Sequence, residues 1–417
     1  MTSSSLSSLF LLALFAGLMV RFWLAMRQML HVRFHRNAVP PAFADSISLE
    51  AHQKAADYTV ARVRLGMIDL FISSSLLLLL TLGGGLQALY GVAARFADGG
   101  SLLHGVAFIA LTAAVSWGVD LPLGIYRSFG LEARFGFNRL TPGLFAADTA
   151  KGIVLAMVIG LPLIAGVLWI MDTMGERWWA YTWASWLGFN LLVMLVYPTF
   201  IAPLFNRFEP LENGPLQARI QNLMERCGFR LSGLFVMDGS RRSAHGNAYF
   251  TGFGASRRIV FFDTLLEKLS PAEVEAVLAH ELGHFHHKHL WKRLAVIGAG
   301  SLAFFALLGH VSSQPWFFEG LGMNVGGTAP TLVLFALVLP VFTFPLTPFM
   351  SLWSRKHEFE ADAYAAAQAS ATELIQALVK LYRDNASTLT PDPLYSTVYD
   401  SHPPAALRIA RLQAHTR

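Results

Sequence analysis

The stretch His280-Glu281-Leu282-Gly283-His284 is the part of the sequence from which the rest of the chain is interpreted. Ser270-Pro271 upstream is a helix-start signal, and good helix formers with an apolar stripe follow it. Residues four apart share one helical face, so both imidazoles can reach one metal ion, while Glu281 points elsewhere and can take a proton from an attacking water. This pattern is typical of zinc-dependent hydrolysis, and a helix that carries these residues by chance is the weaker alternative.

A third protein ligand is needed, and the sequence narrows the choice. One branch of such sites requires Gly and His at positions 287 and 290, which are His287 and Leu290 here, so that branch is excluded. The remaining common choice is a glutamate from another helix, with one open position for water. Glu358 and Asp362 lie four apart, so Glu358 can bind the metal while Asp362 accepts a hydrogen bond from a ligand histidine. Glu360 is the competing ligand, but it lies on another face, and we favour Glu358 and one Zn²⁺ per chain.

The composition indicates an integral membrane protein. Of 417 residues, 54% are hydrophobic and only 14% are charged, whereas soluble domains carry about 25% charged residues. The net charge of +5 is small, and there is no basic arm or aromatic-basic motif, so we expect no nucleic-acid partner. Cys227 is the only cysteine, which excludes an intrachain disulfide and a Cys-rich zinc site.

Seven apolar stretches are long enough to cross a bilayer core of about 30 Å. They cover residues 9–26, 70–90, 102–123, 153–172, 179–201, 293–312 and 330–352. The positive charges follow the first stretch, which favours a retained anchor over a signal peptide. Arg21 lies near the inner end of that stretch, where its side chain can reach the membrane surface.

The spans divide the chain into a membrane part and a polar part. We expect a mainly α protein of the following organisation: a membrane domain 1–201 with five spans and cytoplasmic loops 27–69 and 124–152, a cytoplasmic zinc-site insertion 202–292, two spans within 293–352, and a C-terminal cytoplasmic part 353–417 that completes the site. Because the last two spans return the chain to one side, His280, His284 and Glu358 are expected on the same face of the membrane.

Lysine and arginine counts predict the orientation. Loop 27–69 carries six of them and loop 124–152 carries four, whereas the opposite side has only Arg95 and Arg177. The N-terminus is therefore expected outside, and the zinc site in the cytoplasm.

Two further segments are candidates for substrate contact. Residues 246–252 and 258–263 have strand patterns, and Asn247, Ala248, Tyr249 and Phe250 are candidates for an edge strand that pairs with an extended peptide. An ordinary hairpin is the alternative that this pattern leaves open.

The C-terminal segment holds two more candidates. His402 begins a final amphipathic helix and can donate a hydrogen bond to an oxyanion, and Arg408 can pair with Asp362. From the residues alone, an exposed histidine and a solvated arginine are the commoner outcomes. The histidines at 286, 287 and 289 are more simply a polar face where the next span begins than a second metal site.

The chain resembles the CAAX prenyl protease 1 family, which are integral-membrane zinc endopeptidases of the gluzincin type. The resemblance extends over most of the chain. It is carried by Leu121-Pro122, Phe135–Arg139, Asp148, Lys151, Pro203–Asn206, Asp238–Ser243, Asn247–Gly252, Asp263–Leu266, His280–His284, Glu358–Asp362 and Ser401–Pro404.

The resemblance implies seven long helices that enclose a water-filled chamber, capped on the cytoplasmic side by a zincin-type α+β metalloprotease domain. It implies zinc ligands at His280, His284 and Glu358, a catalytic base at Glu281, and substrate backbone binding along 247–250. His402 and Arg408 are implied to complete the site. Eukaryotic members remove the last three residues of prenylated CAAX proteins and cut again nearer the N-terminus.

We therefore expect a zinc endopeptidase whose partners are membrane lipid and a peptide or protein substrate, with or without a prenyl group. The Ala/Leu-rich composition and the lack of an ER-retention tail favour a bacterial inner membrane. The alternatives are a quality-control protease without lipid preference and a non-catalytic scaffold or chaperone that keeps zinc. A transporter is more distant, because the spans carry few charges.

Overall fold

The computed structural model describes all residues except 213, 230–232, 252–257 and 415–417, and of Phe250 and Thr251 it describes the backbone alone. The described part contains seven helical segments that are long and apolar enough to cross a membrane: Ser3–Phe34, Leu49–Leu80, Leu102–Glu132, Pro142–Thr173, Gly175–Phe205, His289–Val311 and Thr328–Gln368. The predicted number of spans and the mainly helical fold are confirmed.

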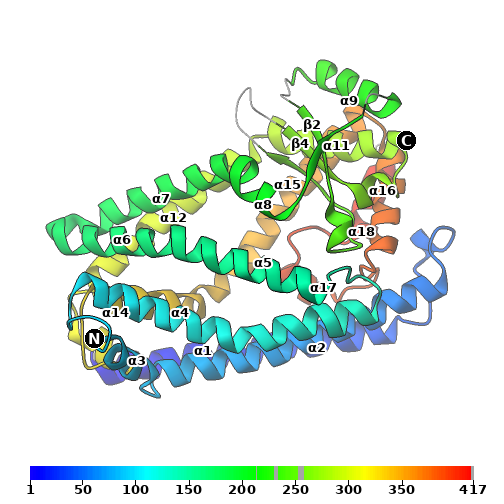
Figure 1. The fold of residues 1–417 in the computed structure, drawn as a ribbon. Helices are drawn as coiled ribbons and strands as arrows, with labels where there is room; N and C mark the ends of the chain where they lie inside the picture. Colours follow the sequence, from blue (N-terminus) through cyan, green and yellow to red (C-terminus); the bar gives the residue numbers. More distant parts are fainter. Residues whose placement is uncertain (213, 230–232, 252–257, 415–417) are drawn as a thin grey trace.

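The first two spans are longer than a bilayer requires. Helices α1 (Ser3–Phe34) and α2 (Leu49–Leu80) have 32 residues each, or about 48 Å, and they pack against each other (Figure 1). The predicted second span, 70–90, is wrong, because α2 ends at Leu80 and a separate helix α3 (Gly85–Ala93) follows. The cause is a turn in which Gly84 has φ +77°, a conformation that side chains other than glycine rarely adopt, although the apolar composition continues through it.

Of the other spans, α12 is a single helix, and the rest are made of several helical pieces, some joined by π-helical or 3₁₀ turns. These pieces are α4 (Leu102–Ile125) with η2 (Tyr126–Glu132); α5 (Pro142–Leu155), η3 (Ala156–Gly160) and α6 (Leu161–Thr173); η4 (Gly175–Arg177), α7 (Trp178–Val196), η5 (Tyr197–Ile201) and α8 (Ala202–Phe205); α12 (His289–Val311); and α14 (Thr328–Thr343), η8 (Phe344–Leu346) and α15 (Thr347–Gln368), with the short η1 (Pro41–Phe43) and α13 (Pro315–Glu319) in connections. Helix α15 therefore carries residues 347–352 of the predicted last span and then Glu358 without a break.

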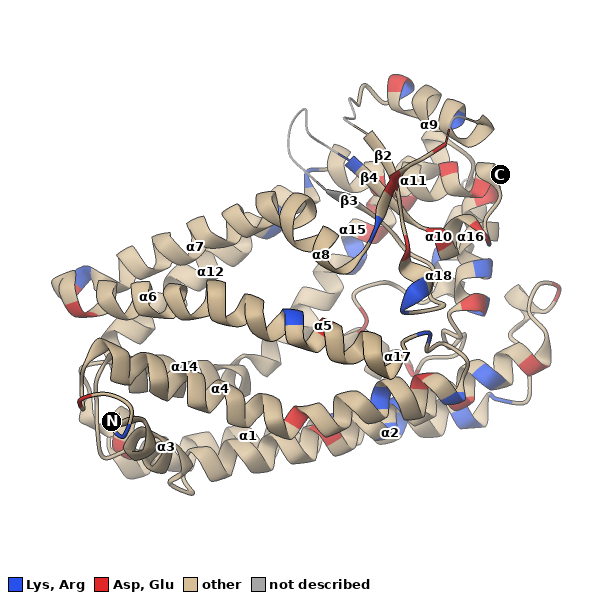
Figure 2. Cartoon of the chain, viewed as in Figure 1, with Lys and Arg blue, Asp and Glu red and all other residues tan. Residues whose placement is uncertain are grey.

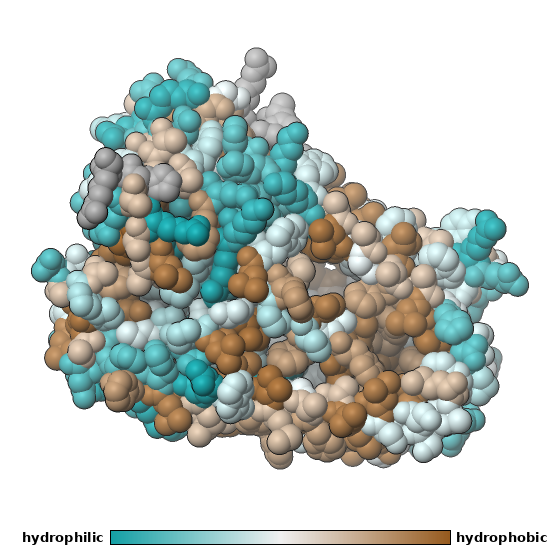
Figure 3. Space-filling view, turned by 180° about the vertical axis from the view of Figure 1, so that it is seen from behind, coloured by the Kyte–Doolittle hydropathy of each residue, from teal (hydrophilic) through white to brown (hydrophobic). Residues whose placement is uncertain are grey.

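The surface separates into two parts. Large apolar side chains such as Phe71, Val158 and Phe200 are about two-thirds exposed on the helices. Figure 3 shows a largely hydrophobic and hollowed surface over the helices and a hydrophilic surface over the remaining part. This distribution is that of a multi-pass membrane protein with a polar cap.

A four-stranded sheet lies in the cap, in the order β1-β2-β4-β3. Its strands are β1 (Phe208–Pro210), β2 (Gly233–Met237), β3 (Ala248–Thr251) and β4 (Arg258–Phe262). Strands β2 and β4 are parallel, and β3 pairs antiparallel with β4, with Ala248 opposite Phe261. The two predicted strands are confirmed, and β3 is an edge strand.

The cap helices bury their apolar faces against this sheet and one another. They are α9 (Pro215–Arg226), α10 (Asp263–Leu266), α11 (Pro271–His286), α16 (Ala371–Asp384), α17 (Pro393–Tyr399) and α18 (Ala405–Ala414), with the turn η6 (Gly239–Arg241). Ile220, Phe261, Leu278 and Leu374, which come from four different elements, are fully buried in one cluster. This core fixes α11 against α9, α15 and α16.

Candidate active site

Helix α11 carries the central motif and has a well-defined start. The Ser270 hydroxyl accepts a hydrogen bond from the Glu273 backbone N–H at 3.3 Å, and the Glu273 carboxylate accepts one from the Ser270 N–H at 2.7 Å. Lys380 of α16 donates to the same buried carboxylate at 2.7 Å. The predicted helix start is confirmed, and it sets where His280 and His284 lie along the helix.

The approach of α11 to α15 depends on Gly283. A Cβ atom at this position would lie 2.8 Å from the Ala361 Cα, closer than side chains pack. The absence of a side chain lets the two helices touch, and this contact brings Glu358 of α15 to the two histidines of α11.

The three predicted metal ligands form a triangle of side chains. His280 Nε2 and His284 Nε2 are 3.3 Å apart. His280 Nε2 lies 3.4 Å from Glu358 Oε2, and His284 Nε2 lies 3.4 Å from the other oxygen of the same carboxylate, Oε1. A tetrahedral zinc ion with bonds of about 2.0–2.1 Å separates its ligand atoms by about 3.3–3.4 Å. Glu358 Oε2 is also buried without a hydrogen-bond partner. The donor set therefore fits a metal ion.

Asp362 and Arg408 lie behind His280. Asp362 Oδ1 is 2.9 Å from His280 Nδ1, and Arg408 donates two hydrogen bonds to the Asp362 carboxylate at 2.6 and 2.8 Å. Both Asp362 and Arg408 are at most 5% exposed. The solvated arginine that the residues alone favoured is wrong, because Arg408 of α18 packs into the site.

A different pair lies behind His284. His284 Nδ1 is 3.0 Å from Nδ1 of His289, the first residue of α12, whose Nε2 is 2.8 Å from Glu360 Oε2. Glu360, the competing ligand in the sequence, is thus turned to His289 and away from the triangle. The sequence predicts that His289 belongs to a polar face at the start of the sixth span, and this prediction is wrong, because His289 is only 5% exposed. In the sequence, the one signal for the contact between His289 and His284 is that the two residues lie five positions apart.

The two ligand histidines differ in the direction in which their pKa is shifted. Burial alone would lower the pKa of His280, but hydrogen bonds with Asp362 and Glu358 outweigh it and raise the pKa to about 9. Burial, followed by the nearby charge of His280, lowers the pKa of His284 to about 3. The two neighbouring carboxylates therefore favour a positive charge on the His280 side of the site.

Glu281 and His402 are the two predicted residues with a chemical role beside the ligands. Burial raises the pKa of the half-buried Glu281, which makes its carboxylate a stronger base. His402 Nε2 lies 3.4 Å from Glu358 Oε1, and its Nδ1 is 3.0 Å from the Ser401 hydroxyl. The side chain of His402 is 62% exposed, which agrees with the exposed histidine expected from the residues alone. Partial desolvation lowers the pKa of His402, which favours a neutral ring that still carries one N–H donor.

The predicted substrate strand lies at the open edge of the sheet. Asn247 accepts a hydrogen bond from the Phe262 backbone N–H at 3.0 Å, and the ladder continues from Ala248 through Tyr249 and Phe250. Burial raises the pKa of Tyr249 to about 12. No strand pairs with the outer edge of β3 within the described residues, and the side chain of Phe250 lies outside them.

Comparisons with known proteins agree with this geometry. A family model described as CAAX prenyl protease N-terminal, five membrane helices, matches residues 28–207, and the model for Peptidase family M48 matches residues 210–416. CAAX prenyl protease 1 of Saccharomyces cerevisiae is 34% identical over 401 residues, which cover 90% of this chain and 88% of the yeast protein. The chain belongs to the CAAX prenyl protease 1 family.

Other members show the same extent of similarity. The human CAAX prenyl protease 1 homolog is 30% identical over 425 residues, covering 90% of this chain and 88% of the human protein. The crystal structure of S. mikatae Ste24p superposes with a TM-score of 0.90 at 32% identity and covers 99% of both chains. This protease is thus a multi-pass membrane metalloendopeptidase that hydrolyses peptide or protein substrates.

Proposed function

We propose that this protease holds one zinc ion per chain with His280, His284 and Glu358. The observation that carries the proposal is the convergence of these three side chains: His280 Nε2 and His284 Nε2 are 3.3 Å apart, and each lies 3.4 Å from one of the two oxygens of the Glu358 carboxylate. When bound, zinc supplies Lewis acidity that polarises the scissile carbonyl and lowers the pKa of water.

The surrounding residues have separate tasks in peptide hydrolysis. Glu281 takes a proton from the attacking water and delivers it to the leaving amine. The N–H of His402 donates a hydrogen bond to the oxygen that becomes negative as the carbonyl is attacked. The outer edge of β3, from Asn247 to Phe250, binds the extended substrate through backbone hydrogen bonds.

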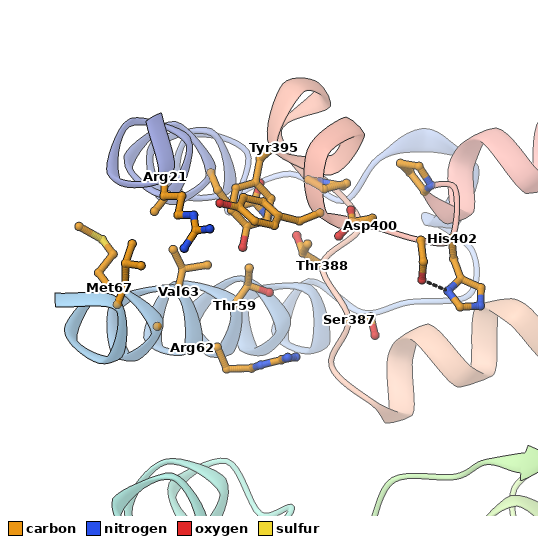
Figure 4. Close-up of a pocket in the computed structure, with 18 of the residues that line it drawn as sticks. Arg21, Thr59, Arg62, Val63, Met67, Ser387, Thr388, Tyr395, Asp400 and His402 are labelled. Carbon is orange, nitrogen blue, oxygen red and sulfur yellow. Dashed lines mark hydrogen bonds between the residues drawn. The ribbon is translucent and has the colours of Figure 1, made fainter. Parts of the chain in front are cut away.

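We further propose that the substrates are prenylated CAAX proteins or peptides, cut three residues from the C-terminus. A cavity of about 790 Å³ between α1, α2 and the C-terminal segment includes His402 in its lining, together with polar residues such as Thr59, Arg62 and Asp400 (Figure 4). Room of this size next to the catalytic groups suits a peptide.

A second cavity of about 270 Å³ suits the lipid part of such a substrate. It is lined mainly by leucines and other apolar residues of α1, α2 and α14, and it shares Arg21 with the first cavity. Figure 4 shows Arg21 beside α2 in the first cavity, which differs from the expected course towards the membrane surface. Each CH₂ group of an isoprenoid chain buried in the second cavity contributes about 0.8 kcal/mol.

The proposed location is a bacterial inner membrane, with the active site facing the cytoplasm. Lys and Arg gather around the sheet and the neighbouring ends of α1 and α2, and few lie at the far ends of these helices (Figure 2). This asymmetry is the one that sets orientation in the membrane.

The test is cleavage of a farnesylated CAAX peptide by the purified protein, with and without a zinc chelator, beside Glu281→Gln. Loss of the last three residues that is sensitive to chelator and absent in the variant supports the proposal. Equal kcat/KM for farnesylated and unmodified peptides would favour a quality-control protease. One zinc per chain without cleavage of either peptide, or of an unfolded protein, would favour the scaffold.

A further inference from the structure

The contacts behind His284 form a line of three side chains. His284 Nδ1 meets His289 Nδ1 at 3.0 Å, and His289 Nε2 meets Glu360 Oε2 at 2.8 Å. Glu360 Oε1 is 3.8 Å from the exposed Lys356 ammonium. The line thus runs from a proposed metal ligand in the site to a charge at the surface.

The protons along this line follow from the metal bond. A histidine that binds a metal through Nε2 carries its proton on Nδ1. Only one of two facing Nδ1 atoms can carry a proton in a hydrogen bond, so His284 donates and His289 accepts. His289 then carries its own proton on Nε2 and donates it to Glu360.

We propose that His289 and Glu360 are positioning residues that hold His284 in its metal-binding tautomer and ring orientation. This inference rests on the proposed metal site. Neither residue touches the reacting atoms, and their effect is on metal affinity through His284.

The backbone is shaped to bring His289 to this place. Lys288, between α11 and α12, has φ +55°, a conformation that residues other than glycine adopt rarely and at a cost. The turn at Lys288 starts α12 at once, so that the ring of His289 comes back to the ring of His284. The ring of His357 stacks on the ring of His289, with centroids 3.9 Å apart and planes at 13°.

A second metal site is the rival explanation for His289, His357 and Glu360, since a donor atom from each lies within 4.8 Å of the others. The stacking argues against it. Imidazole lone pairs lie in the ring plane, and an ion cannot lie in the planes of two parallel rings that are stacked face to face. His289 has, in addition, both nitrogens in hydrogen bonds.

The experiment measures zinc binding by the full-length protein, apart from activity. His289→Phe keeps an aromatic ring on His357 but removes both hydrogen bonds, whereas His289→Gln keeps an acceptor and a donor. The matched control is His286→Phe, because His286 is an exposed histidine at the end of α11. Competition with a chelator gives the zinc affinity, and the absorption bands of the cobalt-substituted protein report the ligand geometry.

We expect zinc affinity to fall about 10–100-fold in His289→Phe, as for other partners of metal-bound histidines, with altered cobalt bands. His289→Gln should recover a large part of the affinity, and His286→Phe should match the wild type. Glu360→Ala provides a second test if His289→Phe does not fold, and a smaller loss in the same direction is expected.

Wild-type affinity and cobalt bands in both His289→Phe and Glu360→Ala would overturn the inference. A second bound zinc in the wild type that is lost in His357→Phe would also overturn it, in favour of the rival metal site. Failure of the proposed function looks different: the wild type would bind no zinc, or His284→Ala would bind it equally well.

Discussion

The two histidines of the metal triangle are supported in different ways. His280 is backed by the carboxylate of Asp362, which is held by two hydrogen bonds from the buried Arg408. His284 is backed by a second imidazole, His289, whose own partner is the partly exposed Glu360. The charged carboxylate of Asp362 contacts Nδ1 of the His280 ring directly. Nδ1 of the His284 ring contacts the neutral imidazole of His289, and the carboxylate of Glu360 lies behind His289.

This difference affects what each support contributes. A buried ion pair holds its histidine firmly, but its loss leaves an uncompensated charge in the protein interior. A neutral hydrogen-bond acceptor fixes the tautomer at a lower desolvation cost, and its loss is correspondingly milder. The His280 side is therefore expected to govern both stability and metal binding, and the His284 side to govern metal binding alone.

The largest effect is expected from removing Glu358, the proposed metal ligand that lies beside both histidines. Glu358→Ala should lose zinc and all activity, because one of three donors is gone and the charge that balances the dication goes with it. The loss of affinity should exceed the about 10–100-fold expected for any supporting residue. The measurement is the zinc content per chain by atomic absorption. A Glu358→Ala variant that still binds one zinc ion per chain would rule out Glu358 as a ligand.

Glu281→Gln leaves both supports in place and should affect the reaction alone. We expect kcat to fall by about 10²–10⁴, because the proton acceptor is lost, with zinc content unchanged. Cleavage assays on protein of measured zinc content test this expectation. Activity equal to the wild type would mean that another group takes the proton from the water.

Arg408→Met breaks the charged support of His280 and leaves the Asp362 carboxylate buried without its partner. A destabilisation of about 3–5 kcal/mol is expected, together with weaker zinc binding. Thermal unfolding in detergent should show it. Arg219→Met is the control, because Arg219 pairs with Glu275 while about half exposed and should change stability by at most about 1 kcal/mol. Equal melting temperatures for both variants would contradict the expectation that the buried Arg408–Asp362 pair contributes more to stability than an exposed ion pair.

Gly283→Ala should disturb both histidines together by pushing α11 away from Ala361. Overpacking of this kind costs about 1–3 kcal/mol, and zinc affinity should fall with it. Gly300→Ala is the matched control, since a Cβ there meets nothing within 4 Å and a helical alanine is favoured. If both substitutions leave stability and affinity unchanged, the close approach of the two helices is not what aligns the ligands.

The sequence alone determined what depends on local spacing. His280 and His284 four apart on one helix, the pairing of Glu358 with Asp362, and the number of apolar spans all follow from helical periodicity and apolar length. Such features are fixed by neighbours along the chain. The structure bears out the helix that carries the motif, the number of spans and the two strands β3 and β4.

Only the tertiary structure decided which distant residues reach the site. Arg408 meets Asp362 across 46 positions, and Glu360 meets His289 across 71. No periodicity links such positions, because their contact depends on the packing of α11, α12, α15 and α18 against one another. For the same reason, the sequence assigned His289 to a polar surface, although the turn at Lys288 folds it back behind the metal ligand.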